Sequence, residues 1–381
     1  MPDALNGKSG SSAAGSGVSL REHRALHLGI LSNLLNCVLG PRLCGRNADG
    51  EWTAWGIETV PNAQGKMPSS FVRTFTDPDE YAAAIRQGTH RIAVTQRGLF
   101  TAKLIRIDLH RLWMQHFSEE LPRASHIDGW GGRVIIVFRT HPGSSVTRNG
   151  IELGLTNISR LRPGQSYYQR TSGPTAYGSM SLPLDKMASI GGTIAGHDLI
   201  PPYDDGTIIP PPEVMAKLRR LHAAARGLAE DAPAVLSHPE VARGLEQALI
   251  EAMVHCLGSG EVREDRAAER HHAAIMRRFD RVIEQHLDEP LYVPELCKEV
   301  GASERTLLAC CQEHLGMGPK RYLLLRRMHL VRRALRESSP AKTTITEIAT
   351  RFGFWQFGRL AVEYKALFGE APSATLRHVI Q

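Results

Sequence analysis

The chain has 381 residues, of which 42% are hydrophobic and 22% are charged. This length and composition support two or more domains with hydrophobic cores and exclude a disordered or fibrous protein. Uninterrupted apolar runs such as Val134–Phe138 fall far short of the roughly 20 residues that a membrane span needs. The six cysteines are too sparse for a disulfide framework and include no zinc-type Cys-x-x-Cys pair. We therefore expect a cytoplasmic protein without a membrane partner.

The net charge is +7, and most of the basic excess lies in the C-terminal part of the chain. Residues 273–381 carry 17 basic and 12 acidic side chains, whereas residues 1–272 carry 29 and 27. A basic segment that follows a nearly neutral one is typical of a nucleic-acid-binding domain joined to a second domain. This distribution predicts that residues 273–381 bind nucleic acid.

Residues 1–68 predict an N-terminal extension of low structural content, because they are rich in Gly, Ser and Asn. Dense apolar patterning begins only at Phe71, shortly after Met67. Two alternatives are open: translation starts at Met67, or the extension is a genuine N-terminal arm. We expect residues 1–66 to be dispensable, since they offer too little apolar surface to offset the entropy of ordering.

Residues 69–258 predict a β-rich domain. Between Leu99 and Ile200, short alternating or β-branched runs are separated by turn residues, as at 148–150 and 162–164. This pattern indicates an antiparallel sandwich or barrel.

Two predicted helices complete this domain. Their apolar residues recur at helical spacing, from Val214 to Leu228 in one and from Val241 to Cys256 in the other. These stripes either pack on the β domain or form the seam of a homodimer. Residues 259–272 are polar and highly charged, so they predict a linker.

Several side chains of types that can bind metals, sense redox state or catalyse reactions are interpreted here as structural. The histidines at positions 110, 116, 126 and 141 lack the spacing of a metal site. Cys310 and Cys311 are expected to be buried as small hydrophobic residues rather than to act as a redox sensor. No Gly-x-Ser-x-Gly, Walker or His-Glu-x-x-His motif occurs, so the sequence predicts no enzyme, metal or cofactor. Some aromatic residues could line an effector cavity, although core positions are favoured: Trp113, Trp130, Tyr167, Tyr168 and Tyr177.

The last hundred residues contain an internal repeat. Leu296–Pro319 aligns with Ile348–Pro372, with Gly301 and Gly353 at equivalent positions. Each copy predicts a helix, a tight turn at the glycine, a second helix and a glycine-containing exit before proline. This is the plan of a helix-turn-helix unit, whose second helix can lie in the major groove of DNA.

Residues 320–336 predict a helix that connects the two units. It carries seven basic residues and no acidic one, so contact with phosphates is favoured over a merely solvated face. A helix of this length spans roughly 25 Å, which suits two recognition helices in successive major grooves. The capping-box spacing of Thr344 and Glu347, and Pro294 in a first turn, support helix starts at the expected places.

Six motifs stand within this region: Ser303-Glu-Arg-Thr-Leu307, Gly316-Met-Gly-Pro-Lys-Arg-Tyr322, Arg326-Arg-Met328, Ile345-Thr-Glu-Ile-Ala349, Arg351-Phe-Gly-Phe354 and Phe368-Gly-Glu-Ala-Pro372. With these motifs, the sequence resembles the AraC/XylS family of transcription regulators. The resemblance covers about residues 275–379 and implies a seven-helix domain with two helix-turn-helix units at residues 273–381. More loosely, it implies a cupin-like effector-binding or dimerisation domain at residues 69–258.

The resemblance also implies which residues contact DNA. Only Arg305 and Arg359 among the base-facing positions can make bidentate contacts to guanine, so direct readout is sparse. The base-facing residues are Arg305, Leu308 and Ala309 in the first groove and Phe357, Gly358, Arg359, Ala361 and Val362 in the second. The other expected contacts are Ser303, Thr306, Lys320, Arg321, Arg326 and Arg327.

The sequence thus predicts a multidomain transcription regulator, with a mostly-β cupin-like domain and trailing helices before an all-α DNA-binding domain. We expect it to bind double-stranded DNA sequence-specifically and to respond to a small-molecule effector, and a homodimer is one of the two alternatives that the apolar helix stripes leave open. Activation is favoured, with RNA polymerase as the partner. One alternative is a cupin-like metal- or ligand-binding protein or enzyme that the DNA-binding domain merely localises. Another is a regulator without an effector, controlled by abundance or by protein partners.

Overall fold

The computed structural model describes residues 44–46, 52–54, 67–86, 88–196, 199–200, 206–263, 267–286 and 291–377. The chain divides into two compact units, Met1–Glu58 and Thr59–Gln381. In the first unit, β1 (Cys44–Arg46) and β2 (Trp52–Ala54) pair as an antiparallel hairpin. Most of the predicted extension at residues 1–68 lies outside the described residues.

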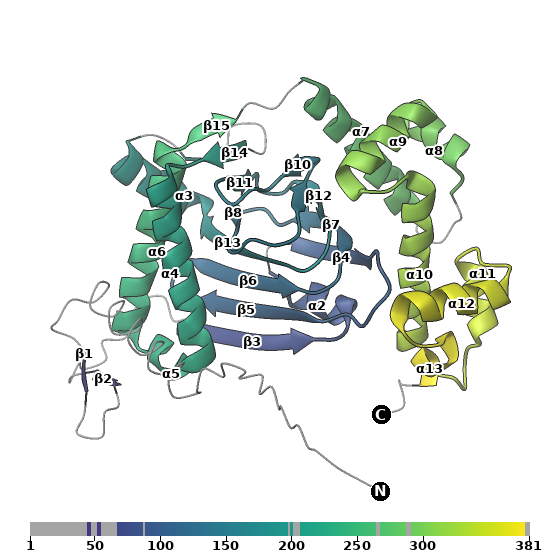
Figure 1. Cartoon of the computed structure of the whole chain (residues 1–381), viewed down its shortest axis with the longest axis horizontal. Helices are drawn as coiled ribbons and strands as arrows, with labels where there is room; N and C mark the ends of the chain where they lie inside the picture. The colour runs from purple at the N-terminus through teal and green to yellow at the C-terminus, as the bar shows by residue number, and fades with distance from the viewer. Residues whose placement is uncertain are drawn as a thin grey trace, which may run out of the picture. The chain divides into compact units, whose positions relative to one another are not determined.

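Two antiparallel sheets form the β domain of the second unit (Figure 1). The first sheet has the strand order β10-β9-β12-β7-β4, and the second has the order β15-β14-β11-β8-β13-β6-β5-β3. The predicted β-rich class is therefore confirmed. The strands are β3 (Ser69–Phe75), β4 (Gly88–Val94), β5 (Ala102–Asp108), β6 (Trp113–Glu119), β7 (Arg123–Gly129), β8 (Arg133–Arg139), β9 (Val146–Arg148), β10 (Ile151–Glu152), β11 (Ile158–Leu161), β12 (Ser166–Thr171), β13 (Thr175–Pro183), β14 (Gly206–Ile209) and β15 (Glu261–Arg263).

The turn that joins β9 to β10 follows from its sequence. Asn149 and Gly150 have φ angles of +46° and +83°, which suit a two-residue hairpin turn with both central residues in the left-handed region. Gly164 also has a positive φ, of +74°. Both predicted turns are confirmed.

The sheets begin earlier than the strand pattern predicts. Strand β3 pairs with β5 along its whole length, from Ser69 opposite Asp108 to Phe75 opposite Ala102. Only Phe75 in this strand is fully buried, so β3 lacks the alternation of apolar and polar residues that marks a half-buried strand. The short helix α2 (Pro78–Ala84) then leads into β4.

A hydrophobic core fills the space between the two sheets and α2. Tyr81, Phe117 and Tyr177 are buried there, and the rings of Phe117 and Tyr177 stack with their centroids 4.6 Å apart. Tyr167 and Tyr168 are also buried, as the core interpretation predicts, whereas Trp130 is 52% exposed.

Three helices, α4 (Pro212–Asp231), α5 (Pro233–Leu236) and α6 (Pro239–Ser259), follow α3 (Leu184–Ile190) and a π-helical turn. Helix α4 packs against α6 and against β3 and β5 (Figure 1). The apolar stripes of α4 and α6 are buried within the chain itself. Of the two alternatives that the sequence left open, this is the one in which the stripes pack within the chain.

The segment predicted as a linker, residues 259–272, contains regular structure. Strand β15 pairs with β14, with Thr207 opposite Arg263, and α7 begins already at Ala267. The described part of the C-terminal domain consists of seven helices, which confirms its all-α class. They are α7 (Ala267–Gln285), α8 (Val293–Val300), α9 (Glu304–Leu315), α10 (Pro319–Glu337), α11 (Ile345–Arg351), α12 (Phe357–Phe368) and α13 (Pro372–Arg377). Across the described residues, no helix is both long and apolar enough to cross a membrane.

Candidate nucleic-acid interface

The first helix-turn-helix unit is formed by α8 and α9. Helix α8 ends at Gly301, whose φ of +68° lies in the left-handed region, where glycine lacks the steric cost of a side chain. Helix α9 begins after Ser303, whose hydroxyl accepts a hydrogen bond from the Thr306 backbone N–H at 3.1 Å. Pro294 lies in the first turn of α8, as predicted.

The second unit, α11 and α12, also has a glycine at its turn, but its side-chain cap lies at the start of the first helix. The Thr344 hydroxyl accepts from the Glu347 N–H at 3.2 Å, and the Glu347 carboxylate accepts from the Thr344 N–H at 2.7 Å. This confirms the predicted capping box. Gly353 has a φ of +73° at the turn.

The two second helices present the predicted base-facing residues to solvent. On α9, Leu307 and Cys310 are buried in the domain core, while Leu308 is 49% exposed. On α12, Leu360 and Tyr364 are buried, whereas Val362 is 70% exposed. The remaining predicted base-facing residues are also exposed: Arg305, Ala309, Phe357, Gly358, Arg359 and Ala361.

One exposed aromatic residue at this surface was not predicted from the sequence. Trp355 precedes α12 and is 71% exposed. Its position directly after the turn at Gly353, outside the apolar spacing of α12, is the signal that could have identified it.

Helix α10 connects the two units, as predicted, but most of its arginines have partners within the chain. Arg326 pairs with Glu284 of α7 at 3.3 Å. Arg327 donates to the Gly353 carbonyl oxygen at 3.4 Å and lies 5.1 Å from the centre of the Phe354 ring. Its guanidinium therefore contacts the turn of the second unit.

The remaining basic residues of α10 divide into two groups. Lys320 and Arg321 are exposed at the start of the helix. The three arginines of the last turns, at positions 332, 333 and 336, pair with carboxylates of the β domain. In this structure, the arginines that the sequence assigned to phosphates are thus largely occupied by protein groups.

Helix α7 also pairs with the β domain. Arg91 of β4 contacts Asp128 at 2.8 Å and Glu284 at 3.4 Å. His126 of β7 lies 2.9 Å from Asp280 of α7. The side chains of His126, Asp128 and Asp280 lie close enough together to hold a metal ion. However, the Arg91 guanidinium is hydrogen-bonded to both His126 and Asp128, so this cluster already contains a cation, and we describe it as an ion-pair network.

The cysteines of α9 are buried thiols. Burial raises the pKa of Cys310 to about 11 and also raises the pKa of Cys311. Both side chains are inaccessible to solvent. A thiol with a raised pKa is a poor nucleophile, so the geometry favours the core interpretation over a redox sensor.

Two cavities that border on the β domain differ in size. The space between the sheets, next to Arg123, Tyr167 and Tyr177, holds only about 20 Å³, which is room for about one water molecule. A larger cavity of about 170 Å³ lies between the β domain and α7, where Thr207 and Ala273 are among its lining residues.

The helical domain is similar to parts of known proteins. A family model described as a helix-turn-helix domain matches residues 296–378. A probable thc operon regulatory protein of Rhodococcus erythropolis is 43% identical over 97 residues, which cover 26% of this chain and 29% of the relative. The XylDLEGF operon transcriptional activator of Pseudomonas putida is 37% identical over 102 residues, covering 26% of this chain and 32% of the relative.

These matches span about a third or less of the curated relatives. The crystal structure of the AraC-like transcriptional activator CuxR is also similar, with a TM-score of 0.36, 17% identity, and coverage of 74% of this chain and 99% of that chain. This TM-score is too low to relate the β domain to it. The family model, the identity to two operon regulators and the two helix pairs together show that the C-terminal part of this chain contains a helix-turn-helix domain.

Proposed function

We propose that this chain is a transcription regulator that binds double-stranded DNA sequence-specifically through α9 and α12. The observation that carries the proposal is the pair of helix-turn-helix units, whose second helices both present the predicted base-facing residues to solvent. The relatives named as operon regulators support this role. We also propose activation through contact with RNA polymerase, because one relative is named a transcriptional activator. The sequence shows none of the catalytic motifs named above, so we assign no reaction.

Binding-site selection tests this function directly. The full-length protein is incubated with a library of random duplexes, and the retained sequences are compared with those retained by the double variant Arg305→Ala/Arg359→Ala. We expect a defined motif for the unaltered protein and a weakened or relaxed motif for the variant. Recovery of no preferred sequence by the unaltered protein would contradict the proposal.

We further propose that a small polar effector binds in the cavity between the β domain and α7. This cavity is lined by strands β9, β10, β12 and β14 and by the first DNA-binding-domain helix, so a molecule held there would contact both domains. Charged side chains of both signs line it, including Arg148, Glu152 and Arg277. The cavity between the sheets has room for about one water molecule, so it is a weaker candidate for the effector site.

A thermal-shift screen of small metabolites tests the effector site. Ala273→Leu introduces a larger side chain into the lining of the cavity and is expected to abolish the shift caused by a bound metabolite. Ala268→Leu is the matched control, because Ala268 is exposed on the same helix and does not line the cavity. Equal shifts in both variants would place the bound molecule elsewhere.

A further inference from the structure

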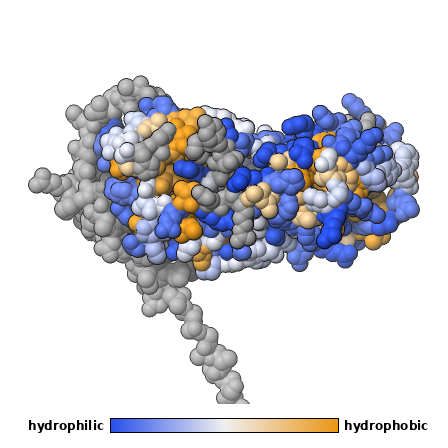
Figure 2. Space-filling model, turned by 90° about the horizontal axis from the view of Figure 1, so that it is seen from above, coloured by the Kyte–Doolittle hydropathy of each residue, from blue (hydrophilic) through white to orange (hydrophobic). Residues whose placement is uncertain are grey.

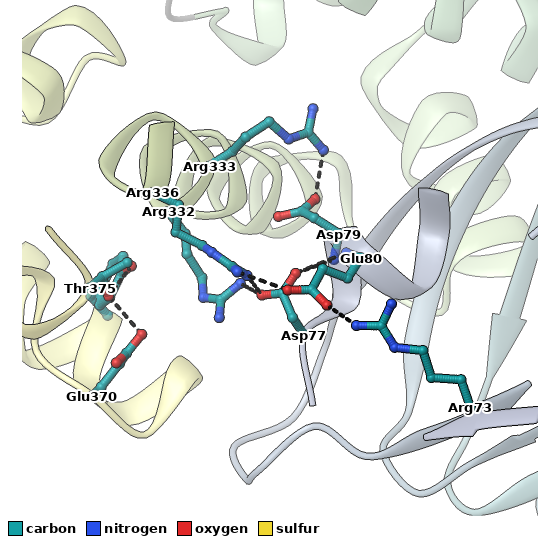
Figure 3. Close-up of polar contacts among 10 residues, drawn as sticks. Arg73, Asp77, Asp79, Glu80, Arg332, Arg333, Arg336, Glu370 and Thr375 are labelled. Atoms are coloured by element: carbon teal, nitrogen blue, oxygen red, sulfur yellow. Dashed lines mark hydrogen bonds and ion pairs between the residues drawn. The ribbon is translucent and has the colours of Figure 1, made fainter. Parts of the chain in front are cut away.

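The first residues of α2 and the last turns of α10 form an ion-pair cluster, which we call the α2–α10 clasp (Figure 3). The acidic side chains are Asp77, Asp79 and Glu80 of the β domain. The basic side chains are Arg332, Arg333 and Arg336 of the DNA-binding domain. About 250 residues of chain separate the two sides.

Every member of the clasp has an opposite charge beside it. Arg332 and Arg336 both contact the Asp77 carboxylate. Arg333 Nη2 lies 2.7 Å from Asp79 Oδ1, and Arg336 Nη2 lies 3.1 Å from Glu80 Oε1. The guanidinium groups of the three arginines are therefore all paired with carboxylates.

The centre of the clasp is shielded from water. The side chain of Asp77 is 8% exposed and that of Arg332 is 11% exposed. Burial opposes ionisation of Asp77, but Arg332 and Arg336 hold its pKa below the usual range. Charges shielded in this way interact more strongly than exposed pairs do.

A buried contact beside the clasp attaches the same helix to the sheet. His329 of α10 is buried, and its Nε2 accepts a hydrogen bond from the Val94 N–H of β4 at 3.0 Å. Burial lowers the pKa of His329 to about 4, so near neutral pH the ring is uncharged and can accept this bond. Helix α10 thus packs on the β domain through the ion pairs of the clasp and through a hydrogen bond to an uncharged histidine.

We propose that the clasp competes with DNA for the last turns of α10, so that the docked chain binds DNA more weakly than an undocked one. The inference rests on the proposed DNA-binding function. Guanidinium groups bind carboxylates and phosphates through the same planar array of donors. Carboxylates of α2 therefore occupy arginines that, once released, pair with the DNA backbone. The kind of partner that fits the released face is a row of phosphates.

The test uses the full-length protein with the triple substitution Asp77→Asn/Asp79→Asn/Glu80→Gln. Asparagine keeps the ability of position 77 to cap α2, where Asp77 now accepts from the N–H groups of residues 79 and 80. The matched control is Asp185→Asn/Glu213→Gln/Asp231→Asn, which removes the same charge from exposed positions on α3 and α4. Dissociation constants are measured by fluorescence anisotropy on the selected duplex at several salt concentrations.

We expect the triple variant to bind at least fivefold more tightly than the unaltered protein and the control. Its salt dependence should also steepen, by about 0.9 in the logarithmic slope for each phosphate gained. Adding Arg333→Ala and Arg336→Ala to the triple variant should return both values toward those of the unaltered protein. If that addition leaves the gain intact, the gain comes from the lost negative charge alone and the competition is disproved.

If the triple variant binds DNA equally or more weakly and the unaltered protein binds normally, the competition between the clasp and DNA is disproved, and the proposed function still stands. Absence of binding by all variants would overturn both. If the triple variant does not fold, as judged by circular dichroism, Glu80→Gln alone serves the same purpose. Glu80 is half-exposed, and the expected change is smaller but of the same sign.

Discussion

Arg359 is the residue of α12 best suited to read a base. Its side chain is 71% exposed, and its ion pair with Glu363 on the next turn is at the surface, where such pairs contribute little. The guanidinium is therefore available to meet the O6 and N7 atoms of guanine.

We expect Arg359→Ala to cost about 1–3 kcal/mol of binding free energy at the preferred sequence and to relax the preference at one base position. Binding-site selection and anisotropy titrations measure both effects. Lys365→Ala is the control, because Lys365 is an exposed basic residue in the last turn of the same helix. An unchanged base preference for Arg359→Ala would show that Arg359 contacts only the backbone.

Glu119 and Arg123 form a buried ion pair in the β domain. The Arg123 Nε and Nη2 atoms each lie 2.9 Å from a Glu119 oxygen, and the hydroxyls of Tyr81 and Tyr177 donate to the same carboxylate. The side chains of Arg123 and Glu119 are 3% and 0% exposed. Removal of one partner leaves a buried charge without compensation.

We expect Arg123→Met to lower the free energy of unfolding of the β domain by about 3–5 kcal/mol. Urea denaturation followed by intrinsic fluorescence measures this loss. Arg243→Met, which removes a partner of the half-exposed Glu240, should cost less than about 1 kcal/mol. Similar losses for the two variants would show that burial of the Glu119–Arg123 pair has no energetic effect.

Among the elements, α11 depends on the cap at Thr344, the residue directly before it. Thr344→Ala removes the hydroxyl that satisfies the Glu347 N–H and should lower stability by about 1 kcal/mol. Hydrogen exchange of the α11 amides should accelerate accordingly. Thr344→Ser keeps the hydroxyl and should behave as the unaltered protein does; equal acceleration in both variants would refute the role of the cap.

The helix pairs could be predicted because their signals are local. The glycine turns at 301 and 353, the capping box and the apolar spacing of α10 all lie within a few residues of the structure that they specify. Strand β15 could not be predicted, because its Glu-Val-Arg sequence is polar and short. What makes it a strand is its pairing with β14, about 55 residues earlier in the chain.

The exposure of Arg305 and Arg359 also follows from local helix periodicity. The partners of the α10 arginines do not follow from local sequence, since Asp77 and Arg332 are brought together only by the packing of two domains. A run of basic residues looks the same in sequence whether it faces phosphates or carboxylates. For this reason the sequence assigned Arg326 and Arg327 to DNA, while the structure gives both of them contacts within the chain.

At the scale of the whole molecule, three buried histidines link stability to pH. Burial lowers the pKa of His116 to about 2 and those of His222 and His329 to about 4. An unfolded histidine has a pKa near 6.5, so between these values the unfolded chain binds more protons than the folded chain does. The stability that the neutral histidines allow is therefore fully present above about pH 6.5 and is lost as the pH falls toward 4.

We expect the midpoint of thermal unfolding to decrease steadily between pH 6.5 and pH 4.5. His329→Gln can still offer an acceptor to the Val94 N–H and cannot be protonated, so its midpoint should decrease less steeply over the same range. Differential scanning calorimetry in a series of buffers measures both slopes. Identical slopes would mean that His329 takes up no proton on unfolding.

The short connection between the two domains keeps the two sides of the α2–α10 clasp close together after the clasp opens. Strand β15 ends at Arg263 and α7 begins at Ala267, a separation of four Cα–Cα steps or at most about 15 Å. When the clasp opens, the carboxylates of α2 therefore stay near the arginines of α10 at an effective concentration on the order of millimolar. DNA must displace a partner that never diffuses away, so the pairing of the arginines with α2 does not depend on the amount of protein in the cell, whereas their pairing with phosphates depends on the concentration of DNA.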